Sequence, residues 1–114
     1  MLGRTDTDYL DKENDYIYIL HRFDYNSQNL ISQTRKVNKQ SLALDLDTIN
    51  RTHLFARTDA RVFSQQRIPT LGFTSGLHAD YHTPNDKVEF IDFDGLTKRT
   101  RLVFLLTWYL ANRD

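Results

Sequence analysis

Three stretches of the chain have the hydrophobic pattern of β-strands. Residues 16–20 form an unbroken run of aromatic and aliphatic side chains, which predicts a buried strand. Leucines occupy alternate positions over residues 42–46, as in a short strand with one buried face. Residues 68–73 predict a third strand, which the chain enters through Pro69.

Apolar residues at steps of three and four predict a first helix that ends near Gln40 and a last helix that ends near Asn112. The candidate N-caps are Asn26 or Ser27 for the first helix and Asp92 or Asp94 for the last. The expected inner face of the first helix is Leu30, Ile31, Thr34 and Val37. The expected inner face of the last is Leu96, Val103, Phe104, Leu106 and Leu110.

The segments between these elements are expected to be mostly loops. Residues 47–58 are polar, and Asp59 then caps a short helix that carries Val62 and Phe63. Residues 74–87 show no periodicity and contain Gly and Pro, which indicates a structured loop.

Strands that alternate with helices indicate an α/β fold, here part of a three-layer αβα sandwich with a mostly parallel sheet and flanking helices. Two prolines and four glycines are too few for a linker, so residues 1–114 are treated as one unit. Three strands are few for such a sheet. An open edge would remain for pairing with a larger sheet or for self-association.

Composition excludes several classes of protein. Fifteen Lys and Arg balance fifteen Asp and Glu, so no net field attracts nucleic acid or an anionic membrane. The apolar runs are far shorter than the roughly 20 residues of a membrane span. The chain has no Cys, which excludes disulfides, thiolate zinc sites and a Cys nucleophile. Any metal must therefore be held by His, Asp or Glu.

The candidate chemistry lies in residues 76–86, which contain two His, two Asp and one Tyr. The spacing of His78 and His82 is that of a zincin helix, but Ala79 stands where the catalytic Glu would be, and Gly76 and Pro84 disfavour a helix. In an extended chain, His78, Asp80 and His82 would share one face and form a local mononuclear site. The plainer interpretation is that these His cap turns or form hydrogen bonds within the loop.

A longer stretch resembles the C-terminal part of the co-catalytic dizinc aminopeptidases of metallopeptidase clan MH, which include secreted bacterial aminopeptidases and glutamate carboxypeptidase relatives. The residues that carry the resemblance are Arg57-Thr58-Asp59, Phe63, Ile68-Pro69 and the run FTSGLHADYHTPND at 73–86. The resemblance extends over nearly the whole chain. Its most specific part is residues 80–86, and it implies a zinc exopeptidase-like fold.

The resemblance implies a role for five residues. His82 matches the last zinc ligand of the family, and Tyr81 matches the catalytic Tyr whose hydroxyl stabilises the oxyanion of the tetrahedral intermediate. Arg57 matches an Arg near the substrate, although Thr58 replaces the Ser that usually follows it. Thr74 falls where the loop lines the substrate side-chain pocket. Asp86 matches a carboxylate that braces the ligand loop without touching metal.

Each role has a plainer alternative. Tyr81 would serve equally as a packed aromatic residue, Arg57 as an ion-pair partner of Asp59, and Thr74 as the end of a strand. Tyr81 also discriminates within the family, because glutaminyl cyclases resemble this pattern but have Trp at that position. The sequence therefore favours peptide hydrolysis over cyclisation.

The resemblance also implies that most of the metal site is missing. Family members take further ligands and the general base from a His-x-Asp motif early in the domain, a Glu-Glu pair and an Asp-Met-x-Gly segment, none of which precedes the Tyr81-His82 loop in this chain. Residues 1–4 look like the tail of that last segment, so we expect Met1 to be internal to a longer peptidase. His78 is expected to form loop hydrogen bonds, and His21 and His53 are expected to lie on the surface or in packing.

The sequence thus predicts the C-terminal portion of a two-zinc aminopeptidase that acts on peptides, completed by the rest of its domain and inactive alone because one imidazole cannot hold zinc. The alternative is a non-catalytic scaffold or interaction domain with the same fold. Resemblance also suggests a periplasmic or secreted parent protein.

Overall fold

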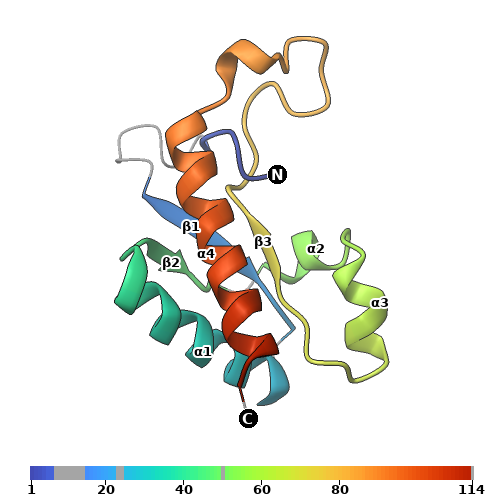
Figure 1. The fold of residues 1–114 in the computed structure, drawn as a ribbon. Helices are drawn as coiled ribbons and strands as arrows, with labels where there is room; N and C mark the ends of the chain where they lie inside the picture. Colours follow the sequence, from blue (N-terminus) through green and yellow to red (C-terminus); the bar gives the residue numbers. More distant parts are fainter. Residues whose placement is uncertain (7–14, 23–24, 50, 114) are drawn as a thin grey trace.

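The structure is a computed structural model that describes residues 1–6, 15–22, 25–49 and 51–113. Its elements are β1 (Tyr16–Leu20), α1 (Tyr25–Ser41), β2 (Asp45–Asp47), α2 (Thr52–Phe55), α3 (Ala60–Gln65), β3 (Gly72–Thr74), the 3-10 helix η2 (Val88–Phe90) and α4 (Phe93–Ala111). The strands form one sheet in the order β2-β1-β3 (Figure 1). The α/β class is confirmed. The sheet is mixed, because β1 pairs in parallel with β2 and antiparallel with β3.

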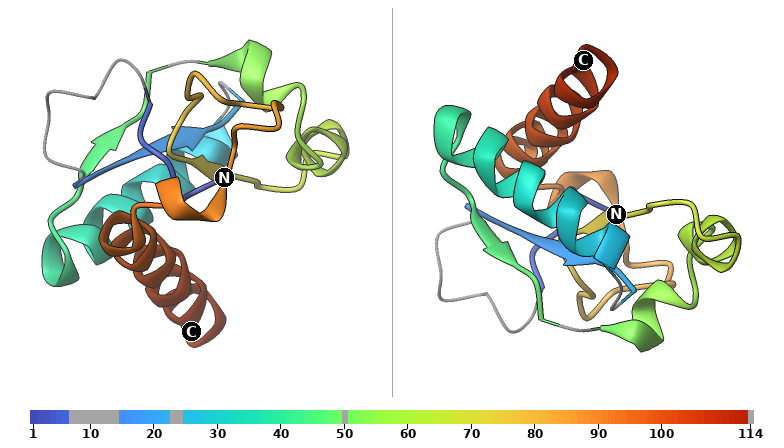
Figure 2. Two further views of the ribbon diagram at one scale, coloured as in Figure 1. Left: turned by 90° about the horizontal axis from the view of Figure 1, so that it is seen from above. Right: turned by 90° about the horizontal axis from the view of Figure 1, so that it is seen from below.

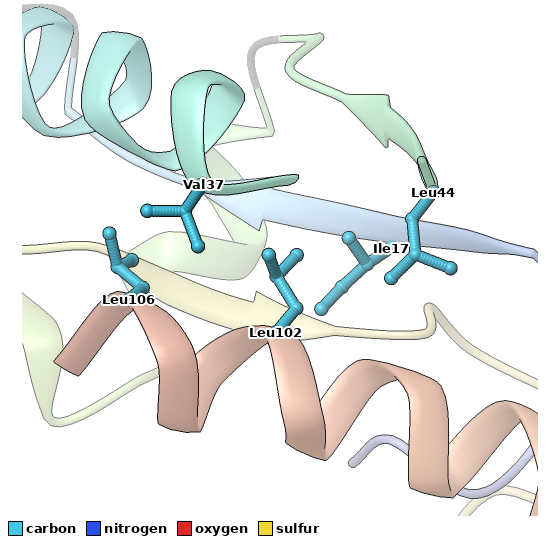
Figure 3. Packing of buried hydrophobic residues seen from close by; sticks show 5 residues of the cluster. All are labelled: Ile17, Val37, Leu44, Leu102 and Leu106. Atoms are coloured by element: carbon cyan, nitrogen blue, oxygen red, sulfur yellow. The ribbon is translucent and has the colours of Figure 1, made fainter. Parts of the chain in front are cut away.

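The composition of β1 explains its central place in the sheet. All five of its side chains are buried, and a strand that is apolar on both faces needs cover on both sides. Figure 1 and Figure 2 show α1 and α4 on one side of the sheet and α2 on the other. The core lies where α1 and α4 meet β1, as Figure 3 shows. It consists of Ile17, Val37, Leu44, Leu102 and Leu106.

The second strand begins later than the sequence predicts. Helix α1 extends to Ser41, and the amides of Leu42 and Ala43 still donate to the carbonyl of Asn38. The Asn38 side chain then pairs with both backbone groups of Leu44. These bonds hold residues 42–44 in the turn that follows the helix, so the strand is Asp45–Asp47 and not 42–46. The predicted N-cap of α1 was wrong, because the helix begins at Tyr25 and both candidates, Asn26 and Ser27, lie within its first turn.

The third strand and the polar segment also differ from expectation. Residues 68–71 lie outside the sheet, and β3 is the three-residue strand Gly72–Thr74. The segment expected to be a loop contains the short helix α2, whose Phe55 is buried. Asp59 stands at the N-cap of α3, but its side chain makes no capping hydrogen bond there with any described residue.

Helix α4 begins as predicted, with the carboxylate of Asp92 accepting a hydrogen bond from the amide of Gly95. The predicted inner face of α4 was wrong at one position. Phe104 is 62% exposed and stacks on Trp108, because it lies two residues from both buried leucines, Leu102 and Leu106, and so on the opposite side of the helix. None of the helices in the described ranges has the length and apolar character that crossing a membrane requires.

Candidate active site

The N-terminal segment, residues 1–6, ties the loop after β3 to the rest of the molecule. The amide of Ser75 donates to the carbonyl of Met1 at 2.9 Å, and the amide of Asp92 donates to the carbonyl of Gly3 at 2.8 Å. The segment therefore links the start of the loop, residues 74–87, to the beginning of α4.

Asp6 and Tyr16 support the first turn of this loop from below. Asp6 is buried and accepts a hydrogen bond from the amide of Leu77 at 2.9 Å. The Tyr16 hydroxyl accepts from the Asp6 amide and donates to the Ser75 carbonyl, both at 2.7 Å. Burial raises the pKa of Tyr16, so its hydroxyl keeps its proton for this donation. Gly76 has φ +92 and lies so close to Asp6 and Tyr18 that no side chain would fit there.

Three predicted site residues line a single pocket of about 370 Å³. Arg57 comes from the turn after α2, Thr74 ends β3, and Tyr81 comes from the loop, while Leu20 and Phe73 supply apolar lining. The buried Thr74 hydroxyl accepts a hydrogen bond from the amide of Gly76. The fold thus brings together side chains that are far apart in sequence.

Arg57 does not form the ion pair with Asp59 that its plainer interpretation requires. Both residues line the pocket, yet no ion pair between them exists among the described residues. The exposed Arg57 guanidinium is therefore available to a ligand in the pocket.

Tyr81 and His82 form one unit at the outer end of the loop. Their rings stack with centroids 3.8 Å apart at an angle of 19°. His82 is exposed and has φ +59, a backbone conformation that costs a non-glycine residue about 1 kcal/mol or more. Tyr81 lines the pocket. The ring of His82 lies against the ring of Tyr81, and His82 is not among the described residues that line the pocket. Residues 79–85 form a series of turns, neither a helix nor an extended strand.

Arg4 holds the two carboxylates of the loop. Its guanidinium donates to Asp80 Oδ2 at 2.8 Å and to Asp86 Oδ1 at 2.7 Å, and it lies over the ring of Phe90. Asp86 is therefore placed where it braces the loop.

His78 is not the loop hydrogen-bonder that the sequence predicts. Its side chain is only 4% exposed, and neither ring nitrogen has a hydrogen-bond partner among the described residues. Its Nε2 is 3.6 Å from Asp86 Oδ2, just beyond hydrogen-bond distance. His21 is buried in packing, with its ring nitrogens near the carbonyls of Arg22 and Thr48, and His53 is exposed.

The described residues do not by themselves fit a zinc ion. No group of three His, Asp or Glu side chains that could hold a metal is found among them. The local site of His78, Asp80 and His82 is therefore not formed. Asp80 is paired with Arg4, His78 is buried, and His82 is left as a single exposed imidazole.

Arg4 and Asp6, which were not predicted as site residues, hold the loop from positions more than 70 residues away. No local pattern marks such residues, because the partners meet only in the folded chain. Gly76 was the one available signal, since a glycine beside a cluster of polar residues often marks a close approach of the backbone.

Comparison with known families gives a match over most of the chain. The model of peptidase family M28 matches residues 5–107. The chain belongs to this family. Peptidases of family M28 are generally zinc-dependent, so the resemblance to metallopeptidases is confirmed at the level of the family. No curated protein and no solved structure matches the chain.

Proposed function

We propose that this M28 chain is part of a zinc-dependent aminopeptidase that hydrolyses the N-terminal peptide bond of peptides. The observation that carries the proposal is the convergence of Arg57, Thr74 and Tyr81 on one pocket, with His82 stacked against Tyr81. Membership of the family supports peptide hydrolysis. The exopeptidase specificity rests on the resemblance of the loop to aminopeptidases.

In this proposal Tyr81 is the catalytic residue of the chain. Its hydroxyl would donate a hydrogen bond to the carbonyl oxygen of the substrate as negative charge develops on it, which is most effective where water is excluded. Arg57 and Thr74 would bind and orient the substrate in the pocket, and Asp86 would hold the loop in place.

His82 would supply one imidazole to the zinc centre of the complete enzyme. Since the resemblance takes the other ligands and the general base from motifs that do not precede the loop in this chain, those groups would come from other parts of the parent enzyme. We therefore propose that the 114-residue chain alone has no peptidase activity.

The test of Tyr81 uses the full parent enzyme and an aminoacyl-nitroanilide substrate. We expect Tyr81→Phe to lower kcat by about 100-fold or more and to change KM only slightly, because the lost hydrogen bond acts mainly in the transition state. Tyr109→Phe on α4 makes the same chemical change away from the pocket and should leave kcat unchanged. Equal, small effects of the two substitutions would contradict the catalytic role.

A second test uses the 114-residue chain with added zinc. We expect no hydrolysis above the buffer blank, and no tight zinc binding by titration calorimetry. Zinc-dependent hydrolysis by the chain would overturn the proposal that the site is completed from outside.

The second candidate function is a non-catalytic scaffold or interaction domain. It is favoured by the lack of a three-donor metal group among the described residues. A parent protein that has no His-x-Asp motif or Glu-Glu pair before this chain, and that binds no zinc, would support the scaffold over the peptidase.

A further inference from the structure

Aromatic side chains cover the side of α4 that faces away from the sheet. Figure 1 shows α4 in front of the strands, so the opposite side of the helix points out of the molecule. On that side Phe93, Phe104 and Trp108 are 60%, 62% and 63% exposed, and the Phe104 and Trp108 rings stack with centroids 6.5 Å apart. The outward side of a surface helix is ordinarily charged or polar, so this side of α4 is unusual.

Uncharged residues connect the three aromatic side chains into one continuous surface. A helix repeats about every 3.6 residues, which brings exposed threonines of α4 to the same side. We call this surface the outer α4 face, and it consists of Phe93, Thr97, Thr100, Phe104, Thr107 and Trp108. The hydroxyls of Thr97 and Thr107 donate to carbonyls of the helix itself and so need no acceptor from outside. Most of the face can therefore lose water at little cost.

The outer α4 face stays exposed whatever extends the sheet. Helix α4 lies between this face and the strands (Figure 1). Strands added at an open edge would pair beside β2 or β3 and lengthen the sheet alongside α4, not over its outer side. A partner for the face must therefore approach α4 from outside the fold.

Two opposite charges flank the outer α4 face. Asp94 and Arg101 are about two turns apart and lie on the same flank of the helix. Asp94 is 77% exposed and contacts Lys98 through Oδ2 at 2.9 Å. Arg101 is exposed and has no ion pair with any residue in the described ranges. In an antiparallel pair of such helices, a two-fold axis near Lys98 would bring each Asp94 to the Arg101 of the other copy.

The same axis also matches the aromatic residues. The midpoint between Phe93 and Phe104 along the helix also falls near Lys98. Phe93 of each copy would therefore meet Phe104 of the other when the charges pair. One arrangement thus satisfies the apolar residues and the charged residues together, which makes the surface complementary to itself.

The apolar area is sufficient for a weak dimer. Besides Phe93, Phe104 and Trp108, Val88 and Phe90 of η2, directly before α4, are 70% and 52% exposed. With about 100 Å² exposed on each of these side chains, two copies would bury about 1,000 Å² of apolar surface. That area is the lower limit for a specific interface and is typical of weak, reversible association.

We propose that the outer α4 face binds a second copy of this chain in an antiparallel, two-fold symmetric dimer. Phe93 and Phe104 form the apolar centre of the interface, and Asp94 and Arg101 form two reciprocal ion pairs at its flank. The dimer does not rest on the peptidase proposal, because neither zinc nor substrate takes part in it.

The test measures the average mass of the 114-residue chain by sedimentation equilibrium from about 1 to about 500 µM protein. We expect the mass to rise from one chain to two, and the fluorescence of Trp108, the single Trp of the chain, to shift to shorter wavelength over the same range. Phe104→Ser should raise the dissociation constant by about 10-fold or more without unfolding the chain, because Phe104 lies outside the core. The matched control is Phe63→Ser on α3, where Phe63 is 53% exposed, and it should have no effect.

Charge reversal tests the arrangement of the two copies. Arg101→Asp and Asp94→Arg should each raise the dissociation constant by about 10-fold, because each brings like charges together. The double variant restores the pairs with their charges exchanged and should return to within about threefold of the wild type. Arg61→Asp on α3 makes the same charge change away from the face and should leave the dissociation constant unchanged.

The outcomes separate the dimer from other occupants of the face. A chain that stays monomeric over the whole range overturns the proposal, and its cosedimentation with phosphatidylcholine vesicles would assign the face to a membrane surface. Association that survives Phe104→Ser and both charge reversals also overturns it and indicates pairing at the sheet edge. If the single reversals fail to fold, the double variant and Phe104→Ser still decide. A monomeric chain leaves the peptidase proposal standing, and an inactive parent enzyme leaves the dimer standing.

Discussion

The substitution Gly76→Ala tests how the loop is held on the sheet. Gly76 has φ +92, and a Cβ at this position would collide with the carboxylate of Asp6 and would lie 2.6 Å from Cε2 of Tyr18. Tyr18 belongs to the fully buried strand β1, so it has little room to move. Asp6 would have to move instead, and its hydrogen bond to the Leu77 amide would be lost.

The expected cost is the sum of two effects. An L-residue in the left-handed region costs about 1–2 kcal/mol. Loss of the buried hydrogen bond between Asp6 and Leu77, with the Leu77 amide left unpaired, costs about 1–3 kcal/mol more. We therefore expect the free energy of unfolding to fall by about 3 kcal/mol, which is a large share of the roughly 5–15 kcal/mol typical of a domain.

The assay is urea denaturation followed by far-ultraviolet circular dichroism. The matched control is Gly72→Ala in β3, whose added Cβ would meet Leu20 Cβ at 3.3 Å, a contact that a small adjustment relieves. We expect this control to cost about 1 kcal/mol or less. If Gly76→Ala is no more destabilising than Gly72→Ala, the account of the Asp6 support is wrong.

Three further predictions concern stability. Burial raises the pKa of Tyr16 above its ordinary value of 10.0, so the unfolded state loses this proton first and the free energy of unfolding should fall as pH rises above 10, a dependence that Tyr16→Phe should reduce in pH-resolved urea titrations. Leu102→Ala should lower the free energy of unfolding by about 2–5 kcal/mol, whereas Phe104→Ala should stay within about 0.5 kcal/mol, and equal losses would contradict the placement of the α4 faces. His82→Gly should leave the melting temperature unchanged or raise it, because it relieves the positive φ of an exposed residue, and a clear decrease would show that the ring of His82 contributes to packing.

Elements with a strong local signal were predictable from the sequence. Strand β1 is apolar at every position and was found at its correct place. The start of α4 was predicted to lie at Asp92 or Asp94, and the structure has Asp92 as the cap. The errors arose where a distant or competing contact decides the outcome. The Asn38 side chain holds Leu44 in the turn after α1, so β2 begins only at Asp45. Phe104 has the right hydrophobicity for the core but the wrong angular position on α4.

The candidate site was likewise only partly predictable from the sequence. The resemblance selected Arg57, Thr74 and Tyr81, and the structure brings these three to one pocket. It could not reveal that Arg4 and Asp6 support the loop, because sequence patterns report neighbours along the chain and not across the fold. The burial of His78 was likewise invisible, since a His in a polar loop is ordinarily solvated.

The backbone strain at His82 gives a physical reason to connect the loop with function. An exposed residue with φ +59 costs energy and gains little packing in return, so the surrounding contacts must hold it in place. Those contacts are the ion pairs of Arg4, the stack with Tyr81 and the hydrogen bonds of Asp6 and Tyr16 to the backbone of Leu77 and Ser75. A loop needed only to connect β3 with α4 could place Gly or Asn at this position and avoid the cost. The strain is consistent with the proposal that the exposed imidazole of His82 binds a group outside this chain, but Ala43 and Arg67 also have positive φ, so the ligand role rests on the loop and not on φ alone.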